Sequence, residues 1–200
     1  MKTNSIKRQI FSLQLTICLS FFALTMPIPV LTSHFLNTHW HGINQHTLLL
    51  VSLGLYPIGG FISTPILGII SDKFGRRNTL ITCLLLSFLA QLATAVAVKL
   101  SSIGMILILR FVAGAFEGNS AIAYASIADL FPSEQRKKYF GKINAAVTLG
   151  WIFGPVTGGL LTISWLHHYQ YSFPFFVSAL LHAIALGIIY RYFNENKKKY

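Results

Sequence analysis

Two charged side chains stand in one long apolar segment, at a spacing that could support proton transfer. Arg110 and Glu117 both fall within residues 103–128, which are otherwise uncharged. On a helix, residues seven apart share one face and lie roughly 10 Å apart along the axis. The same face would also carry Gly114, Ala121 and Tyr124. A carboxylate held beside an arginine can exchange a proton, and a water or a substrate could bridge the two charges.

We interpret Glu117 as a proton-titrating residue whose protonation competes with substrate binding, with Arg110 and Tyr124 as its neighbours on the helix. The alternative is a structural ion pair, or a tie to another helix, because structural networks also perturb buried carboxylates. A charge at the centre of a membrane helix costs about 2.5–3.5 kcal/mol on insertion scales, so such residues usually face a cavity or one another. Both roles stay open at this point.

A second pair, Ser120 and His182, would suit a nucleophile and its base. The segment GNSA and the histidine of the last apolar segment resemble the serine–histidine dyad of rhomboid intramembrane proteases. The glycine that should follow the serine is replaced by Ala121, and other features of that family are not evident. A helix-packing hydroxyl is the simpler role for Ser120. We therefore predict no enzyme activity.

Four histidines crowd the segment between the first two apolar blocks, namely His34, His39, His41 and His46. The triplet HWH could ligate a metal ion. No Cys, Asp or Glu joins these histidines there, so solvated side chains are the expected state. We predict no metal site and no cofactor.

The elements that must position these residues are apolar blocks. The 200 residues are 54% hydrophobic and 10% charged. Six blocks of the roughly 20 residues that a bilayer-spanning helix needs cover about 10–32, 47–70, 79–98, 103–128, 143–163 and 173–190. The first block is too long for a signal peptide and lacks its cleavage site. We predict an all-α membrane protein with six transmembrane helices, a single bundle over 1–200 with three-helix repeats at 1–100 and 101–200.

The positions of the basic residues predict the topology. The net charge of +11 would suggest nucleic acid in a soluble protein. However, fourteen of the sixteen Lys and Arg residues lie before the first block, after the last, or in the second and fourth connections. The positive-inside rule puts these segments, and both termini, in the cytoplasm. The opposite connections hold aromatic residues suited to the outer headgroup layer, namely Trp40, Trp165, Tyr169 and Tyr171. The lipid bilayer, and no nucleic acid, is the expected partner.

One of the basic connections contains the stretch GIISDKFGRR, residues 68–77. We expect a tight turn there, with a sharp bend at Gly75. Asp72 would cap a helix or pair with an arginine. A simple positive-inside anchor would explain the basic residues but not this carboxylate between two glycines.

The fifth block contains GWIFGPVTGG, which spaces Gly150, Gly154 and Gly158 four residues apart on one helix face. Without side chains on that face, a second helix can approach backbone to backbone. Pro155 predicts a kink beside the same face.

These stretches resemble signatures of the major facilitator superfamily. The loop pattern G-x-x-x-D-[RK]-x-G-[RK]-[RK] is matched by Gly68, Asp72, Lys73, Gly75, Arg76 and Arg77. LILRFVAGAFEG resembles the helix-four signature through Arg110, Gly114 and Gly118. The helix-five pattern G-x-x-x-G-P-x-x-G-G is matched by Gly150, Gly154, Pro155, Gly158 and Gly159. SIADLFPSEQRKKYFG resembles the connection between helices four and five of drug exporters, including tetracycline-type ones, with Asp129 and Arg136 in place. Glu117 matches no signature.

The resemblance implies a proton-coupled secondary transporter, because the helix-five pattern is associated in this superfamily with drug/proton antiporters. In the family, the loop Asp and Arg residues form a cytoplasmic charge network that stabilises one access state, and the helix-five glycines shape an outer gate. We therefore expect an efflux antiporter of drugs or other small molecules, exchanging its substrate for protons in a bacterial inner membrane. A sugar or metabolite importer shares the fold but fits the helix-five pattern less well.

The resemblance covers nearly all of the chain but only the N-terminal six of the family's usual twelve helices. In the family, the substrate path runs between two six-helix halves. The chain would then act as a homodimer, act with a separate second half as a partner-requiring subunit, or be an inactive truncated fragment. The sequence leaves these alternatives open.

Overall fold

The described part of the chain, residues 2–38, 44–163 and 171–194 of this computed structural model, folds entirely into α-helices and their links. The helices are α1 (Lys2–Thr25), α2 (Pro27–Asn37), α3 (Gln45–Phe74), α4 (Arg76–Lys99), α5 (Ile103–Ala115), α6 (Asn119–Leu130), α7 (Ser133–Ile163) and α8 (Phe173–Tyr192). They form six spans long and apolar enough to cross a membrane: Ile6–Asn37, Gln45–Phe74, Arg76–Lys99, Ile103–Leu130, Ser133–Thr162 and Phe173–Tyr192. The prediction of an all-α chain with six membrane-spanning helices is confirmed.

Two of the expected helices are each divided in two. The first span changes from α1 to α2 at Met26, next to Pro27, whose ring removes a backbone donor. The fourth span is interrupted between α5 and α6, where Phe116 leaves helical geometry with φ −101° and ψ 4°. By contrast, α3 and α7 continue through their internal prolines. The fourth-span break changes which residues share a face with Arg110.

Glycines let two pairs of helices touch through their backbones. A Cβ placed on Gly59 of α3 would meet the Phe111 carbonyl oxygen, and one on Gly114 of α5 would meet the Tyr56 carbonyl oxygen. The helix-five glycines act in the same way, as predicted. Gly150 and Gly154 pack on α1 and Gly158 packs on Met26, whereas a Cβ on Gly159 would have nothing within 4 Å.

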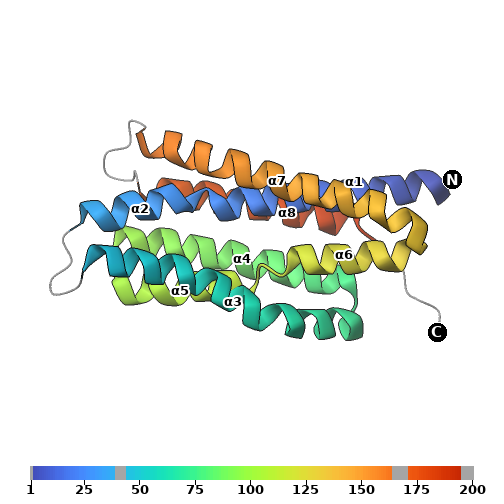
Figure 1. Cartoon of the computed structure of the whole chain (residues 1–200), viewed down its shortest axis with the longest axis horizontal. Helices are drawn as coiled ribbons and strands as arrows, with labels where there is room; N and C mark the ends of the chain where they lie inside the picture. Colours follow the sequence, from blue (N-terminus) through green and yellow to red (C-terminus); the bar gives the residue numbers. More distant parts are fainter. Residues whose placement is uncertain (1, 39–43, 164–170, 195–200) are drawn as a thin grey trace.

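The segments rich in basic residues gather at one end of the bundle, which we call the basic end. It comprises the first turns of α1, the α3–α4 turn, the α6–α7 link and the last turn of α8 (Figure 1). Arg8 lies over the Tyr192 ring, 4.3 Å from its centroid, which joins α1 to α8. Arg77 donates hydrogen bonds to the carbonyl oxygens of Phe193 and Tyr190, both at 2.7 Å, and so caps the C-terminus of α8.

The bundle interior has two apolar clusters. The cluster nearer the basic end includes Leu13, Ile17, Leu80, Leu84, Ile127 and Ile189, and the farther one includes Val30, Phe35, Val98, Ile106 and Phe175. Several polar side chains that lie between the two clusters are also buried. We call them the polar layer: Ser20, Ser87, Gln91, Arg110, Glu117, Ser178 and His182.

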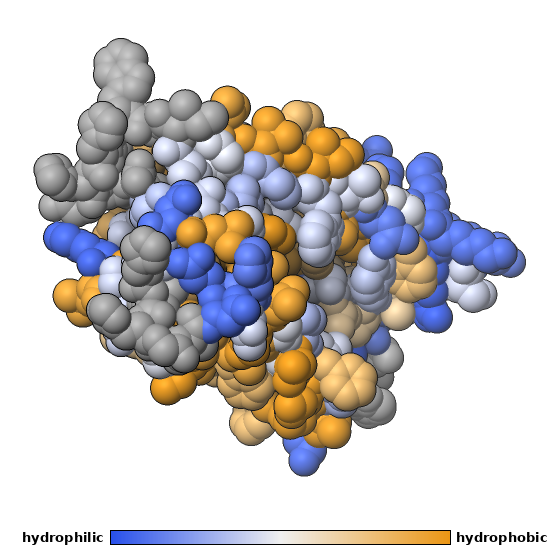
Figure 2. Space-filling view, turned by 60° about the vertical axis from the view of Figure 1, so that its left-hand side comes forward, coloured by the Kyte–Doolittle hydropathy of each residue, from blue (hydrophilic) through white to orange (hydrophobic). Residues whose placement is uncertain are grey.

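The outer surface between the ends is apolar. Figure 2 shows hydrophobic side chains over much of the flank, with hydrophilic residues grouped at the right-hand end and again at the near end on the left. Several large side chains on α3 and α7 are strongly exposed, among them Phe61 at 84% and Val156 at 56%. Such a surface suits lipid or another apolar protein face, because exposed apolar area of this extent is unfavourable in water.

Candidate functional site

The guanidinium of Arg110 is buried at the centre of the bundle, with 2% of the residue exposed. Its Cζ lies 4.8 Å from the centroid of the Tyr56 ring, a cation–π contact between α5 and α3. The glycine contacts of α3 with α5 bring the two backbones close enough for this pairing. Among the described residues, Nε and Nη1 of Arg110 have no hydrogen-bond partner. A buried cation with free donors is poised to bind a carboxylate or another acceptor.

Glu117 lies in the link between α5 and α6, and its side chain is 7% exposed. Oε2 faces the Ser87 hydroxyl of α4 and Nε2 of His182 on α8, both 3.5 Å away. Oε1 has no partner in the part of the chain that the structure describes. Because Glu117 interacts electrostatically with both Arg110 and Tyr56, the carboxylate belongs to the same buried group.

His182 faces Glu117 and not Ser120. Its Nδ1 lies 3.0 Å from the Ser178 carbonyl oxygen, and its Nε2 points toward Glu117. Neither ring nitrogen contacts the Ser120 hydroxyl in the described structure. The geometry that the protease alternative needs, a base beside the serine nucleophile, is therefore not present.

Tyr124 lies apart from Arg110 and Glu117. Its hydroxyl is hydrogen-bonded to Oδ1 of Asn144 on α7, and its ring packs edge-on against Phe140, with centroids 5.4 Å apart. The interrupted fourth span explains the difference, because α6 no longer continues the face that α5 presents. The spacing along an unbroken helix therefore grouped Tyr124 with the wrong neighbours.

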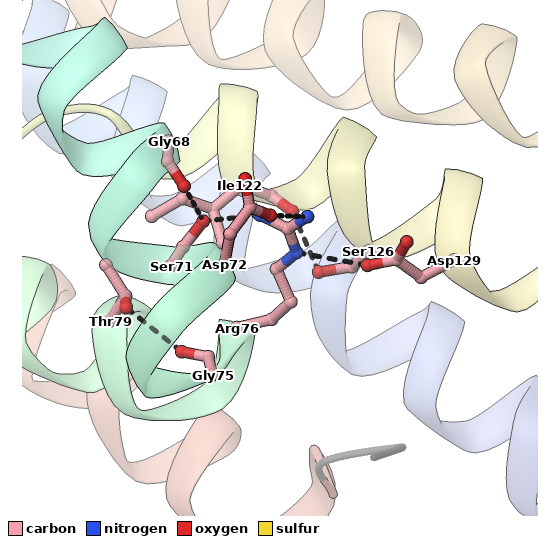
Figure 3. A network of polar contacts seen from close by, with 9 residues as sticks. All are labelled: Gly68, Ser71, Asp72, Gly75, Arg76, Thr79, Ile122, Ser126 and Asp129. Atoms are coloured by element: carbon pink, nitrogen blue, oxygen red, sulfur yellow. Dashed lines mark hydrogen bonds and ion pairs between the residues drawn. The ribbon is translucent and has the colours of Figure 1, made fainter. Parts of the chain in front are cut away.

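A second polar site lies at the basic end, around Arg76 (Figure 3). Arg76 forms an ion pair with Asp72 one turn earlier, and its Nε donates to Oδ2 of Asp129 on α6 at 3.1 Å. It also donates to the Ser71 hydroxyl, which in turn donates to the Gly68 carbonyl oxygen at 2.9 Å. The α3–α4 turn is thereby fastened to the end of α6.

The turn geometry explains one of the two glycines in the loop pattern. Gly75 has φ 94°, a conformation that favours glycine, so it permits the direct change from α3 to α4. A Cβ on Gly68 would have nothing within 4 Å. The structure therefore shows no packing reason for Gly68 in this state of the protein.

The other basic residues of the predicted loop site lie outside the Arg76 network. Arg77 caps α8, and Arg136 donates from Nε to the Phe131 carbonyl oxygen at 2.8 Å, just beyond the end of α6. Lys73 is exposed. The three therefore hold the surrounding turns or face the surface, and Asp72, Arg76 and Asp129 form the ion-pair core.

Replacing Arg76 by Gln is expected to loosen the α3–α4 turn from α6. Charge-assisted hydrogen bonds contribute about 1.5–3 kcal/mol each, and the Arg76 side chain is only 20% exposed. At about 2–4 °C per kcal/mol for a chain of this size, the midpoint of thermal unfolding in detergent should fall by several degrees. Lys73→Gln is the matched control and should leave the midpoint unchanged. Equal midpoints for the two variants would contradict this assignment.

The predicted outer-loop residues are only partly within the described structure. His39, His41, Trp40, Trp165 and Tyr169 lie outside the described residues. His34 is buried in α2, with its ring centroid 5.2 Å from that of Tyr171. His46 is the second residue of α3. No group of three potential metal ligands occurs among the described residues.

Sequence reasoning did not place three residues beside the buried charges, namely Tyr56, Ser87 and His182. Each is a polar or amphipathic residue inside an apolar block, which is an available signal because polar groups in membrane helices usually face the bundle interior. The signal does not say which of them meet, since the helices that carry them are far apart in the sequence.

Six apolar spans around buried charges, with basic links at one end, define an integral, multi-pass membrane protein. The family model of the Major Facilitator Superfamily matches residues 13–200, and the chain belongs to this family.

The curated relatives include drug-resistance proteins. The chain is 32% identical to the "Tetracycline resistance protein, class H" of Pasteurella multocida, over 88% of this chain and 41% of the relative. It is 34% identical to the class C protein of Escherichia coli, over 86% and 41%. "Multidrug resistance protein 2" of Bacillus subtilis is 28% identical, over 92% and 44%.

Solved structures share the fold at lower identity. A D-xylose-proton symporter superposes with a TM-score of 0.76 at 21% identity, covering 92% of this chain and 48% of the other. The POT family transporter PepTSo gives a TM-score of 0.80 at 16% identity, covering 96% and 39%. The chain thus spans less than half the length of these proteins.

Proposed function

We propose that this chain supplies the N-terminal half of a proton-coupled efflux antiporter for drugs or other small molecules. The observation that carries the proposal is the buried group formed by Arg110, Tyr56, Glu117 and His182 in a membrane-spanning bundle. Ionisable residues within the membrane are costly and mark ion or substrate pathways. The names of the relatives support export of a tetracycline-type or other lipophilic drug. A bacterial inner membrane, with the basic end in the cytoplasm, suits the positive-inside rule.

In this proposal Glu117 binds and releases the transported proton, and Arg110 holds the substrate or the deprotonated carboxylate. The two compete because each ligand of the site changes the charge that the other meets. The Asp72–Arg76–Asp129 network holds one access state, since these ion pairs join α3, α4 and α6. The tight packing of the α7 glycines on α1 and α2 supports a role for Gly150, Gly154 and Gly158 in an outer gate.

A second six-helix unit would complete the substrate path. Of the apolar stretches that would cross the membrane, those of α3 and α7 are only 11% and 22% buried inside the bundle. The first span is 56% buried and α4 is 50% buried. Alternating access needs a second wall that can rock against the first. We propose that a separate second half, or a second copy of the chain, covers the exposed sides of α3 and α7.

Crosslinking tests this assembly. In a chain with Cys18 and Cys83 changed to Ser, Phe61→Cys on α3 should give a crosslinked species in membranes. Leu180→Cys on α8 is the control, because Leu180 is also exposed, at 59%, on a helix that packs mainly against α1 and α4. A chain that stays monomeric at both positions has lipid on α3, and the proposed second wall is then wrong.

The transport activity is tested in inside-out membrane vesicles that contain the chain. With an acidic interior, tetracycline should accumulate above the level of vesicles without the protein, and a protonophore should abolish the difference. No difference in either condition means that the chain does not export tetracycline by itself. Accumulation that persists with the protonophore would contradict proton coupling.

A further inference from the structure

The contacts of the His182 ring indicate where its proton lies. The Ser178 carbonyl oxygen can only accept a hydrogen bond, and Nδ1 lies 3.0 Å from it, so Nδ1 carries a proton. A neutral imidazole has a single N–H, which is thereby used. Nε2 then presents a lone pair to Glu117 Oε2, 3.5 Å away. If Glu117 is ionised, two acceptors face each other.

Burial makes this arrangement unfavourable without an additional proton. The side chains of His182 and Glu117 are 0% and 7% exposed. Nε2 of the histidine and Oε1 of the glutamate have no hydrogen-bond partner among the described residues. Two buried hydrogen-bond acceptors that face each other without a proton are costly in such surroundings. One proton between Oε2 and Nε2 removes the repulsion between the two lone pairs and gives Nε2 a hydrogen-bond partner.

We propose that Glu117 and His182 form one proton-binding unit, in which a single proton is shared between Glu117 Oε2 and His182 Nε2. When the proton moves, the Oε2–H bond breaks as the Nε2–H bond forms, and a neutral acid–imidazole pair becomes a carboxylate–imidazolium pair of the same total charge. Release to water leaves a carboxylate and a neutral imidazole. The role of this unit in export rests on the proposed function above.

The position of the pair suits a coupling role. His182 belongs to α8, whereas Glu117 belongs to the link between α5 and α6. A proton shared across that contact ties the last span to the interrupted fourth span. Movement of either span changes the distance between Oε2 and Nε2, so proton binding and helix position are linked.

The titratable groups facing the pair come from three further helices: Tyr56 on α3, Cys83 on α4 and Arg110 on α5. The helices α1, α2, α6 and α7 carry other titratable groups in their described side chains, namely Lys7, Arg8, Cys18, His34, Tyr124, Asp129, Glu134, Arg136, Lys137, Lys138, Tyr139 and Lys142. Arg110 is the charged group that offsets the carboxylate after the proton leaves, because the two interact electrostatically.

Nitrogen NMR of the histidine-labelled full chain in lipid nanodiscs tests the shared proton directly. The His182 signals are those that disappear in His182→Gln. We expect a protonated Nδ1 and an Nε2 signal that moves in Glu117→Gln while the Nδ1 signal stays in place. The control Glu134→Gln, at the exposed start of α7, should leave both signals unmoved. A proton on Nε2 with a bare Nδ1, or an Nε2 signal unaffected by Glu117→Gln, overturns the proposal.

Transport with tetracycline as the probe separates this proposal from the proposed function. In vesicles, His182→Gln should lose the pH dependence of proton-driven tetracycline export. A merely structural histidine would lower export at every pH and keep the pH profile, which would overturn the coupling role. If wild-type export proves independent of protons while the NMR result holds, the proposed function fails and the shared proton stands as a structural contact. If the NMR result fails while proton-driven export persists, only the pair is wrong.

Discussion

Replacing Glu117 by Gln is expected to abolish proton-driven export while leaving insertion into the membrane intact. The amide has nearly the shape of the carboxylate and can keep the contact with Ser87, which lies 3.5 Å from Oε2. It cannot release a proton, so the antiport cycle loses its exchanged ion. The measurement is tetracycline accumulation in acid-loaded inside-out vesicles, with the amount of inserted chain determined in parallel.

Glu134→Gln is the matched control for this substitution. It makes the same chemical change at an exposed carboxylate in the first turn of α7, and export should continue as in the wild type. If Glu117→Gln also exports normally, the carboxylate is a structural tie between the α5–α6 link and α8. Lower insertion of Glu117→Gln would point to the same structural role, because the buried contact would then be needed for folding.

Replacing Gly158 by Ala is expected to have the largest effect on stability of any single methyl addition in α7. A Cβ at this position would overlap the Met26 carbonyl oxygen at the junction of α1 and α2. Backbone atoms cannot move aside as a flexible side chain can, so α7 must separate from the first span. Overpacking of this kind typically costs about 1–3 kcal/mol. At about 2–4 °C per kcal/mol, the thermal midpoint in detergent should fall by several degrees.

The neighbouring glycine provides the control. A Cβ on Gly159 would have nothing within 4 Å, so Gly159→Ala should unfold at the wild-type temperature or slightly above it, since alanine favours helix more than glycine does. Both variants add the same methyl group to adjacent positions of one helix. Equal midpoints would show that α7 does not pack on α1 and α2 as closely as the structure indicates.

Much of the architecture could be predicted because it depends on local patterns. The lengths of the apolar blocks set the six spans, and the basic residues in alternate connections set the shared end. The loop around Gly75 could be predicted as a turn, since its charges and glycines lie within ten residues, and the structure adds Asp129 as the distant partner of Arg76. These features follow from which segments enter lipid and which stay outside.

The surroundings of Arg110 and Glu117 were decided by the tertiary structure. The sequence indicated that both are buried in one span, but the break after α5 moved Tyr124 away and left Glu117 in a link facing α4 and α8. Apolar pattern determines that a segment crosses the membrane and does not determine its rotation about its own axis. That rotation is set by contacts between distant helices, here by Gly59 and Gly114 where α3 meets α5. The α3–α5 contact brings Tyr56 to the arginine, and the packing of α8 against α4 and α1 brings His182 to the carboxylate.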